Sequence, residues 1–192
     1  MLTRRSNIVT MGLWGALSGT IVWILLHLAD WTHIPNLSFS FLGGEFAIAS
    51  GTVIPGFVFG AIFAVLFRSL LRGLGQVGFF FASGIAYFIA YHAASNSVGW
   101  WQTGSEGLDL AACGVLAGVV GSILLTIATL RLIAPPGRDG RLLPVIAGGL
   151  AGALLALTAH DHSDLAWSFL VLFAGWQGIY AASLAPLLRP QA

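Results

Sequence analysis

Charge is scarce in this sequence. Asp, Glu, Lys and Arg together make up only 8% of its 192 residues, and every strong cation is arginine because the chain contains no lysine. A soluble domain has about 25% charged residues, so this chain lacks the charged surface that keeps a protein dissolved in water. Cysteine is nearly absent too, and the single Cys113 excludes an intramolecular disulfide.

Short catalytic motifs are also missing. The sequence contains no Gly-rich phosphate-binding loop, no His-Glu-x-x-His and no Gly-x-Ser-x-Gly. Histidines paired with aspartates could activate water at a metal ion, but no spacing in the chain favours catalysis over binding. We therefore expect a protein that is not an enzyme.

Long apolar runs occupy most of the chain. Hydrophobic residues fill 57% of positions, and the mean hydropathy is +0.90. Runs of about 20 residues or more can cross roughly 30 Å of bilayer hydrocarbon as helices. Six such runs cover residues 8–29, 45–67, 74–93, 108–133, 142–160 and 165–187. We predict an all-α polytopic membrane protein in which residues 1–192 form a single transmembrane domain of six helices.

The arginines occur at alternate connections between the runs. They precede the first run, separate the second from the third and the fourth from the fifth, and follow the sixth: Arg4, Arg5, Arg68, Arg72, Arg131, Arg138, Arg141 and Arg189. The positive-inside rule then places both termini in the cytoplasm, with six crossings. The use of arginine alone is typical of a GC-rich bacterial genome, so the predicted location is the bacterial inner membrane. Because topology explains these cations, the expected partner is the lipid bilayer and not nucleic acid.

The opposite face collects all five histidines and six of the seven acidic residues. With neutral histidine, the arginine side carries a formal charge of +7 and the other side −6, so the outer face would attract cations. A second interpretation concerns Glu45, Asp109 and Asp164, each at the start of a predicted helix. A carboxylate there stabilises the first turn by about 0.3–1 kcal/mol, and we favour this capping role for these three residues.

Three histidines share a position relative to glycine. Each lies at the outer end of an odd-numbered run, eight residues after a glycine: Gly19 and His27, Gly84 and His92, Gly152 and His160. Residues four and eight apart lie along one stripe of an α-helix, and small residues let helix backbones approach closely. The pattern suggests a degenerate repeat of three helical hairpins.

The same histidines are the candidate binding site. If the odd helices pack around a common axis, the three rings meet near the outer surface, where three histidines with a carboxylate suit a divalent transition metal. A haem held between two histidines is the alternative cofactor. The full candidate set for metal or substrate is His27, His92, His160, His162, Asp30 and Asp161. The competing interpretation is that each ring contacts headgroups or bonds a loop carbonyl, and the sequence leaves both open.

Polar or helix-breaking residues inside the bilayer mark a possible path. Pro55 follows Gly51 by four residues near the middle of the second run, so the Gly51 carbonyl loses its helical hydrogen bond and the helix should kink or unwind. Broken helices build transporter sites, although inert kinks are common. Gln177 lies near the centre of the sixth run, where a buried amide needs partners and either joins two helices or lines a path.

The predicted architecture is similar to the membrane substrate-binding subunits of energy-coupling-factor importers and to small six-helix metal permeases. Both resemblances rest on size, helix number, cytoplasmic termini and an outward polar face. They imply a permease or substrate-capturing transport subunit for a cation or small polar solute. The alternatives are a metal- or haem-binding assembly or redox factor, and a structural subunit. Gly-rich helix faces would join the structural subunit to a homo-oligomer or a larger membrane complex.

Overall fold

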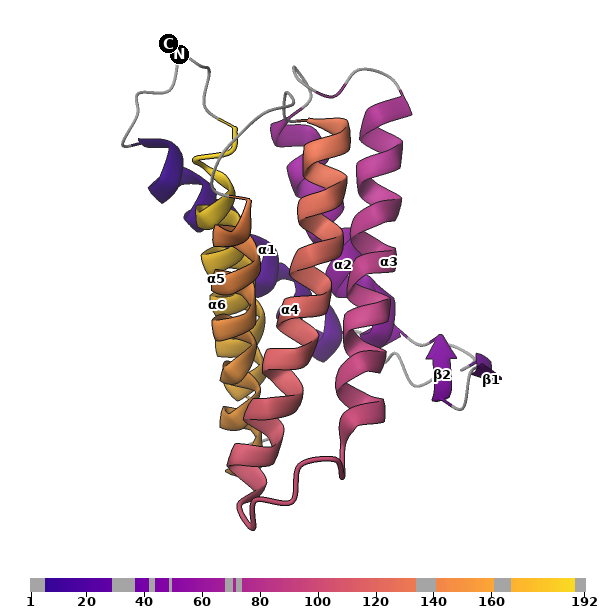
Figure 1. The fold of residues 1–192 in the computed structure, drawn as a ribbon. Coiled ribbons are helices and arrows are strands. Elements are labelled where there is room, and N and C mark those ends of the chain that lie inside the picture. Colours follow the sequence, from indigo (N-terminus) through magenta and orange to yellow (C-terminus); the bar gives the residue numbers. More distant parts are fainter. Residues whose placement is uncertain are drawn as a thin grey trace.

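The computed structural model describes residues 6–28, 37–41, 44–48, 50–67, 71, 74–133, 141–160 and 167–188. The elements in chain order are α1 (Ser6–Leu28), β1 (Leu37–Phe41), β2 (Gly44–Ile48), α2 (Ser50–Leu66), α3 (Leu74–Ser97), α4 (Glu106–Leu132), α5 (Leu142–Gly152), the 3₁₀ helix η2 (Ala153–His160) and α6 (Trp167–Leu184). Successive helices run up and down, so that α1 begins at the same end of the bundle as α6 finishes (Figure 1).

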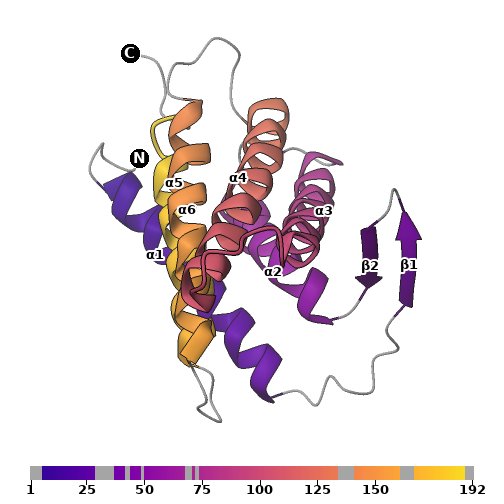
Figure 2. The same cartoon turned by 60° about the horizontal axis from the view of Figure 1, so that its bottom comes forward.

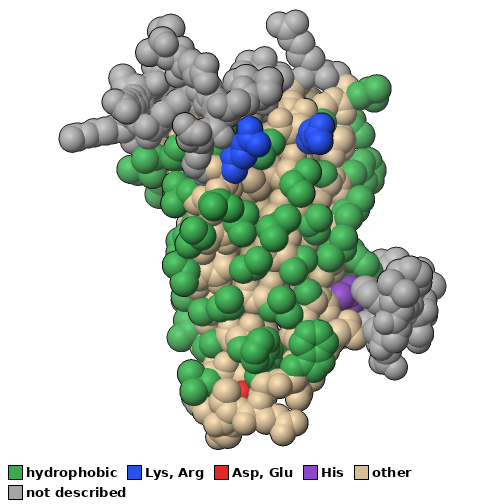
Figure 3. All heavy atoms as spheres, viewed as in Figure 1, with side chains coloured by type: hydrophobic (Ala, Val, Ile, Leu, Met, Phe, Trp, Pro, Cys, Tyr) green, Lys and Arg blue, Asp and Glu red, His purple; other side chains and the backbone are tan. Residues whose placement is uncertain are grey.

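The flank of the bundle is apolar. Five segments are long and apolar enough to cross a membrane: Ile8–His27, Leu74–Ser97, Glu106–Leu132, Leu142–Ala159 and Trp167–Leu184. Hydrophobic side chains cover the visible flank, with arginines near one end and an acidic residue at the other (Figure 3). The chain is therefore a predominantly helical, multi-pass protein of the kind that resides in membranes.

Charge distinguishes the two ends of the bundle. Arg131 lies in the last turn of α4 and Arg141 stands just before α5, at what we call the arginine end. Glu106 and Asp109 lie in the first turn of α4, at what we call the acidic end. We call the half of the bundle nearest the arginine end the arginine half, and the other half the acidic half.

The predicted start of the second span at residue 45 is wrong. Residues 44–48 form strand β2, which pairs antiparallel with β1 so that Glu45 lies opposite Ser40, and α2 begins only at Ser50. Leu37-Ser-Phe-Ser-Phe41 alternates apolar and small polar residues, which is the period of a strand. Glu45 therefore does not cap a helix. The all-α prediction is confirmed for the bundle, and this short hairpin lies beside α2 and α3 (Figure 2).

The helices form a ring in sequence order. Each helix packs against the next one along the chain, and α1 closes the ring by packing against α6. The view in Figure 2 shows the same order from another direction. Side chains that point toward the axis of this ring fill the interior where they are large and leave it hollow where they are small.

Glycines set the closest approaches between neighbouring helices. A Cβ added to Gly114 of α4 would overlap the carbonyl oxygen of Gly152 in α5, and the reverse also holds. Gly19 of α1 lies in the same way against the backbone of Phe173 in α6, and Gly56 of α2 lies against α3. The prediction that glycine brings helices together is confirmed, but the pairs are α1 with α6, α2 with α3 and α4 with α5. They are not the pairs within the three predicted hairpins.

The arginine half of the ring is filled by large side chains. Phe59 and Phe63 of α2, Tyr180 and Leu184 of α6, and Leu125 of α4 are all buried in one hydrophobic cluster. Atoms packed at this density leave little room for a solute. The arginine half is therefore the solid part of the bundle.

A candidate binding cavity in the acidic half

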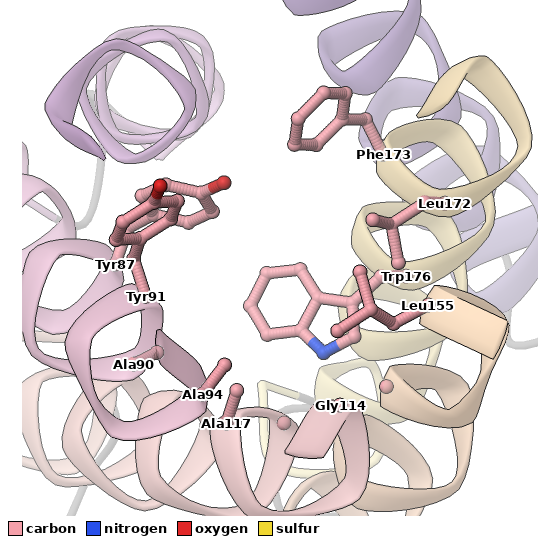
Figure 4. A pocket seen from close by; sticks show the side chains of 12 residues that line it. Tyr87, Ala90, Tyr91, Ala94, Gly114, Ala117, Leu155, Leu172, Phe173 and Trp176 are labelled. Atoms are coloured by element: carbon pink, nitrogen blue, oxygen red, sulfur yellow. The ribbon is translucent and has the colours of Figure 1, made fainter. Parts of the chain in front are cut away.

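Two adjoining hollows lie in the acidic half, and Figure 4 shows the first of them. One has a volume of about 100 Å³ and lies among α3, α4, η2 and α6. The other has a volume of about 330 Å³ and extends to the end of α1. Both are lined by Tyr87, Tyr91, Leu155, Leu172 and Phe173, so they are parts of one cavity. Its size is at the lower end of the range for small-molecule sites.

Small residues on one wall create the hollow. Ala90 and Ala94 of α3 and Gly114, Ala117 and Gly118 of α4 line the first hollow. These positions have a single methyl group or no side chain, while the α4–α5 backbones are already in contact at the glycines. Because the helices are held in place and the residues are small, the axis stays open at this depth.

Aromatic side chains form the facing walls. Figure 4 shows Tyr87 and Tyr91 of α3 on one side of the space, with Phe173 and Trp176 of α6 across from them. Trp176 is fixed in place, because its Nε1 donates to the Gly148 carbonyl of α5 at 3.0 Å. The cavity therefore has at least one rigid aromatic wall.

An aromatic column closes the cavity toward the arginine end. Trp176 stacks on Tyr180, with ring centroids 5.6 Å apart and planes within 7°. Tyr180 contacts Phe59 at 6.1 Å, and Phe59 stacks on Phe63 at 4.3 Å. The Tyr180 hydroxyl and the Thr126 hydroxyl are hydrogen-bonded at 3.2 Å. We call Trp176, Tyr180, Phe59 and Phe63 the aromatic column, and it separates the cavity from the arginine end.

His27 stands at the cavity margin. It is exposed, it lines the larger hollow, and its ring packs against Trp23 at 4.8 Å between centroids. Nδ1 lies 2.8 Å from the Trp23 carbonyl oxygen. A carbonyl can only accept, so Nδ1 carries the hydrogen, and in the neutral ring Nε2 keeps a lone pair. In this tautomer, Nε2 is the acceptor atom of the sequence-predicted His27, a residue that lines the larger hollow.

His92 has different surroundings. It is buried, with 4% of its surface exposed, and it packs edge-on against Phe88 at 4.5 Å and Tyr91 at 5.4 Å. It is not among the residues that line either hollow. Among the described residues, no group of three His, Cys, Asp or Glu side chains could hold a metal ion.

The rest of the predicted metal set lies outside the described residues. This holds for Asp30, Asp161, His162 and the side chain of His160, so a site shared by the histidines stays a prediction. One part of its argument is wrong. The fifth span turns 3₁₀ at Ala153, and three residues per turn remove Gly152 and His160 from the stripe expected at α-helical spacing.

Gln177 joins two helices, as one of its two predicted roles required. It is 1% exposed, and its Nε2 donates to the Pro55 carbonyl at 3.4 Å, linking α6 to α2. α2 stays helical through Gly51 and Pro55, so the expected unwinding does not occur. Pro55, Gly51 and Gln177 do not line the described cavity, and their role in a path stays a prediction.

Asp109, at the acidic end, has a structural role. Asp109, in the first turn of α4, accepts hydrogen bonds from the Thr103 amide at 3.1 Å and the Thr103 hydroxyl at 2.7 Å. It therefore ties the preceding loop to the helix start. This differs from the predicted capping role, because the carboxylate accepts from Thr103 and not from an N–H of the first helical turn. Asp164 lies outside the described residues.

Sequence reasoning missed the residues that make the cavity. Tyr87 and Tyr91 are four residues apart on α3, Ala90 and Ala94 follow the same spacing, and Gly114 and Gly118 repeat it on α4. An aromatic pair beside small pairs at helical spacing was the available signal. Comparison with known proteins adds no function, because no family model, curated protein or solved structure matches this chain.

Proposed function

We propose that this protein is a bacterial inner-membrane transport subunit that captures a small solute from the outer side, either as a permease or as a binding partner of one. The observation that carries the proposal is the cavity in the acidic half, closed at the other end by the aromatic column. A membrane carrier works by exposing a central site to one side at a time. An open half and a filled half along one axis are what its outward-facing state requires.

The orientation in this proposal follows from charge. Arg131 and Arg141 lie at the end where α1 begins and α6 finishes (Figure 1), so the positive-inside rule assigns that end and both termini to the cytoplasm. In this proposal α2 supplies the one crossing that remains after the five longer apolar segments are counted. Its 17 residues span about 25 Å at 1.5 Å per residue, a modest mismatch that bilayers accommodate.

The two alternatives lack a supporting contact. A metal or haem factor needs ligands that the described residues do not bring together. A structural subunit was expected to use its Gly-rich faces for partners, but Gly15, Gly19, Gly114 and Gly152 contact helices of the same chain. Association with further chains stays a prediction, and it is compatible with a binding subunit.

The test is whether filling the cavity removes a bound solute. Ala117→Phe places a ring in the first hollow, and Ile123→Phe adds the same ring on the exposed surface of the same helix. We expect mass spectrometry of solvent extracts to find a solute enriched with the wild-type protein and with Ile123→Phe. Its amount should fall at least about tenfold in Ala117→Phe. The same extract profile for all three proteins would count against the proposal.

A further inference from the structure

The composition of the cavity lining indicates which class of ligand the cavity binds. This inference rests on the proposed function. Within the described residues, the lining consists of aromatic, aliphatic, alanine and glycine residues with His27, and it contains no carboxylate, arginine or lysine. A charged solute would lose its hydration in the membrane interior without gaining an opposite charge. The lining therefore favours a neutral solute, although the outer face as a whole is acidic.

The walls favour a flat solute. Tyr87 and Tyr91 face Phe173 and Trp176 across the hollow (Figure 4), and aromatic rings attract other rings in stacked or edge-on arrangements. Ala94 on the intervening wall allows a planar body to approach the helix backbone closely. Trp176 provides only its ring face, because its N–H is already bonded to Gly148.

A few polar atoms remain to orient the solute. His27 presents Nε2 as an acceptor because Nδ1 donates to the Trp23 carbonyl. The Tyr87 and Tyr91 rings lie at one side of the space in Figure 4, and each ring carries a hydroxyl group. An apolar pocket with a small number of placed polar groups is the usual form of a small-molecule site.

We infer that the cavity binds a neutral, planar and largely apolar molecule that carries a hydrogen-bond donor. Its ring lies between the α3 tyrosines and Phe173, which line both hollows, with Trp176 at the end of the space away from His27, and its donor faces His27. His27 is thus the specificity-determining residue, whereas Trp176 determines affinity for any flat ligand.

The experiment uses two flat probes, one with an N–H donor and one in which a methyl group replaces that hydrogen. Benzimidazole is flat, has one N–H and is neutral at mildly alkaline pH, and 1-methylbenzimidazole lacks the N–H. Each is titrated calorimetrically into the protein in lipid nanodiscs, with empty nanodiscs to subtract partitioning. We expect benzimidazole to bind wild type about 3- to 10-fold more tightly than its methylated analogue, the value of one hydrogen bond. His27→Phe should remove this preference while both probes still bind.

Variants in the wall separate specificity from affinity. Trp176→Ala should weaken both probes about tenfold, whereas Trp14→Ala, which removes an exposed tryptophan on α1, should change neither. If Trp176→Ala does not fold, Ala117→Phe replaces it and should abolish binding of both probes by occupying the hollow.

Two results overturn the inference and leave the proposed function standing. One is binding of tetramethylammonium in preference to benzimidazole, lost in Trp176→Ala, which would show an aromatic cage for an organic cation. The other is a benzimidazole preference that survives His27→Phe. If no probe binds and no solute is retained by the wild-type protein, the proposed function fails as well.

Discussion

The two halves of this bundle share one set of helices but differ along their axis. In the arginine half, Phe59, Phe63, Tyr180 and Leu184 fill the centre. In the acidic half, alanine and glycine occupy one wall and the centre stays hollow. The helices do not splay apart to make the cavity, because Gly114 and Gly152 are in backbone contact at the same depth. Side-chain size, and not helix separation, therefore opens one half and closes the other.

The two halves should differ most in how much free energy of unfolding is lost when a phenylalanine is replaced by alanine. Phe63 is 0% exposed in the aromatic column, so Phe63→Ala should lower the free energy of unfolding by about 3–5 kcal/mol. Phe169 is 37% exposed and lines the hollow, so Phe169→Ala should cost about 1 kcal/mol or less. Reversible unfolding in mixed detergent micelles measures both. Equal losses would mean that the two halves are equally packed.

Replacing a glycine at a contact between helices should have the next largest effect on stability. Gly114→Ala adds a methyl group where the Gly152 carbonyl oxygen already lies, which should destabilise the protein by about 1–3 kcal/mol. Gly107, near the start of the same helix, has nothing within 4 Å of an added Cβ, so Gly107→Ala should be neutral or stabilising by up to about 1 kcal/mol. Melting temperatures of the two variants check this. A neutral Gly114→Ala would show that α4 and α5 are further apart than described.

Replacing Gln177 should have the smallest effect on stability. Its bond to Pro55 is long at 3.4 Å, and its Oε1 is buried without a hydrogen-bond partner in the described part of the chain. Replacing it with leucine removes a weak bond together with an unsatisfied acceptor, so stability should change by less than about 1 kcal/mol. A loss above about 2 kcal/mol in the same unfolding assay would instead make this link a main support of α2.

Much of the fold was predictable because apolar length and arginine placement are local properties of the sequence. The spans at residues 8–29, 74–93 and 108–133 correspond to α1, α3 and α4 with small shifts at their ends. The strands at 37–48 were missed because residue 45 was assigned to an apolar helical run. The change to 3₁₀ geometry after Gly152 was missed because Ala153–His160 has the same composition as an α-helix.

The site was predictable only in part. His27 was selected for its position at a helix end, and it lines the cavity. His92 was selected by the same rule, yet it packs against Phe88 away from the lining. Depth in the membrane can be read from sequence, but the direction that a side chain faces depends on which helices become neighbours. The pairing of α1 with α6 joins the two ends of the chain, and no local pattern encodes it.

The proposed function requires an axis that is open from the outer side and closed toward the cytoplasm. Single cysteines at Ala117 and Ala181, in a Cys113→Ala background, place one thiol in the hollow and one in the filled half. A small, polar but uncharged thiol reagent that crosses membranes slowly is then added briefly to spheroplasts or to inverted vesicles. Ala117→Cys should react in spheroplasts and Ala181→Cys in neither preparation. Equal reaction of the two thiols, or reaction of Ala117→Cys in inverted vesicles alone, would contradict the account.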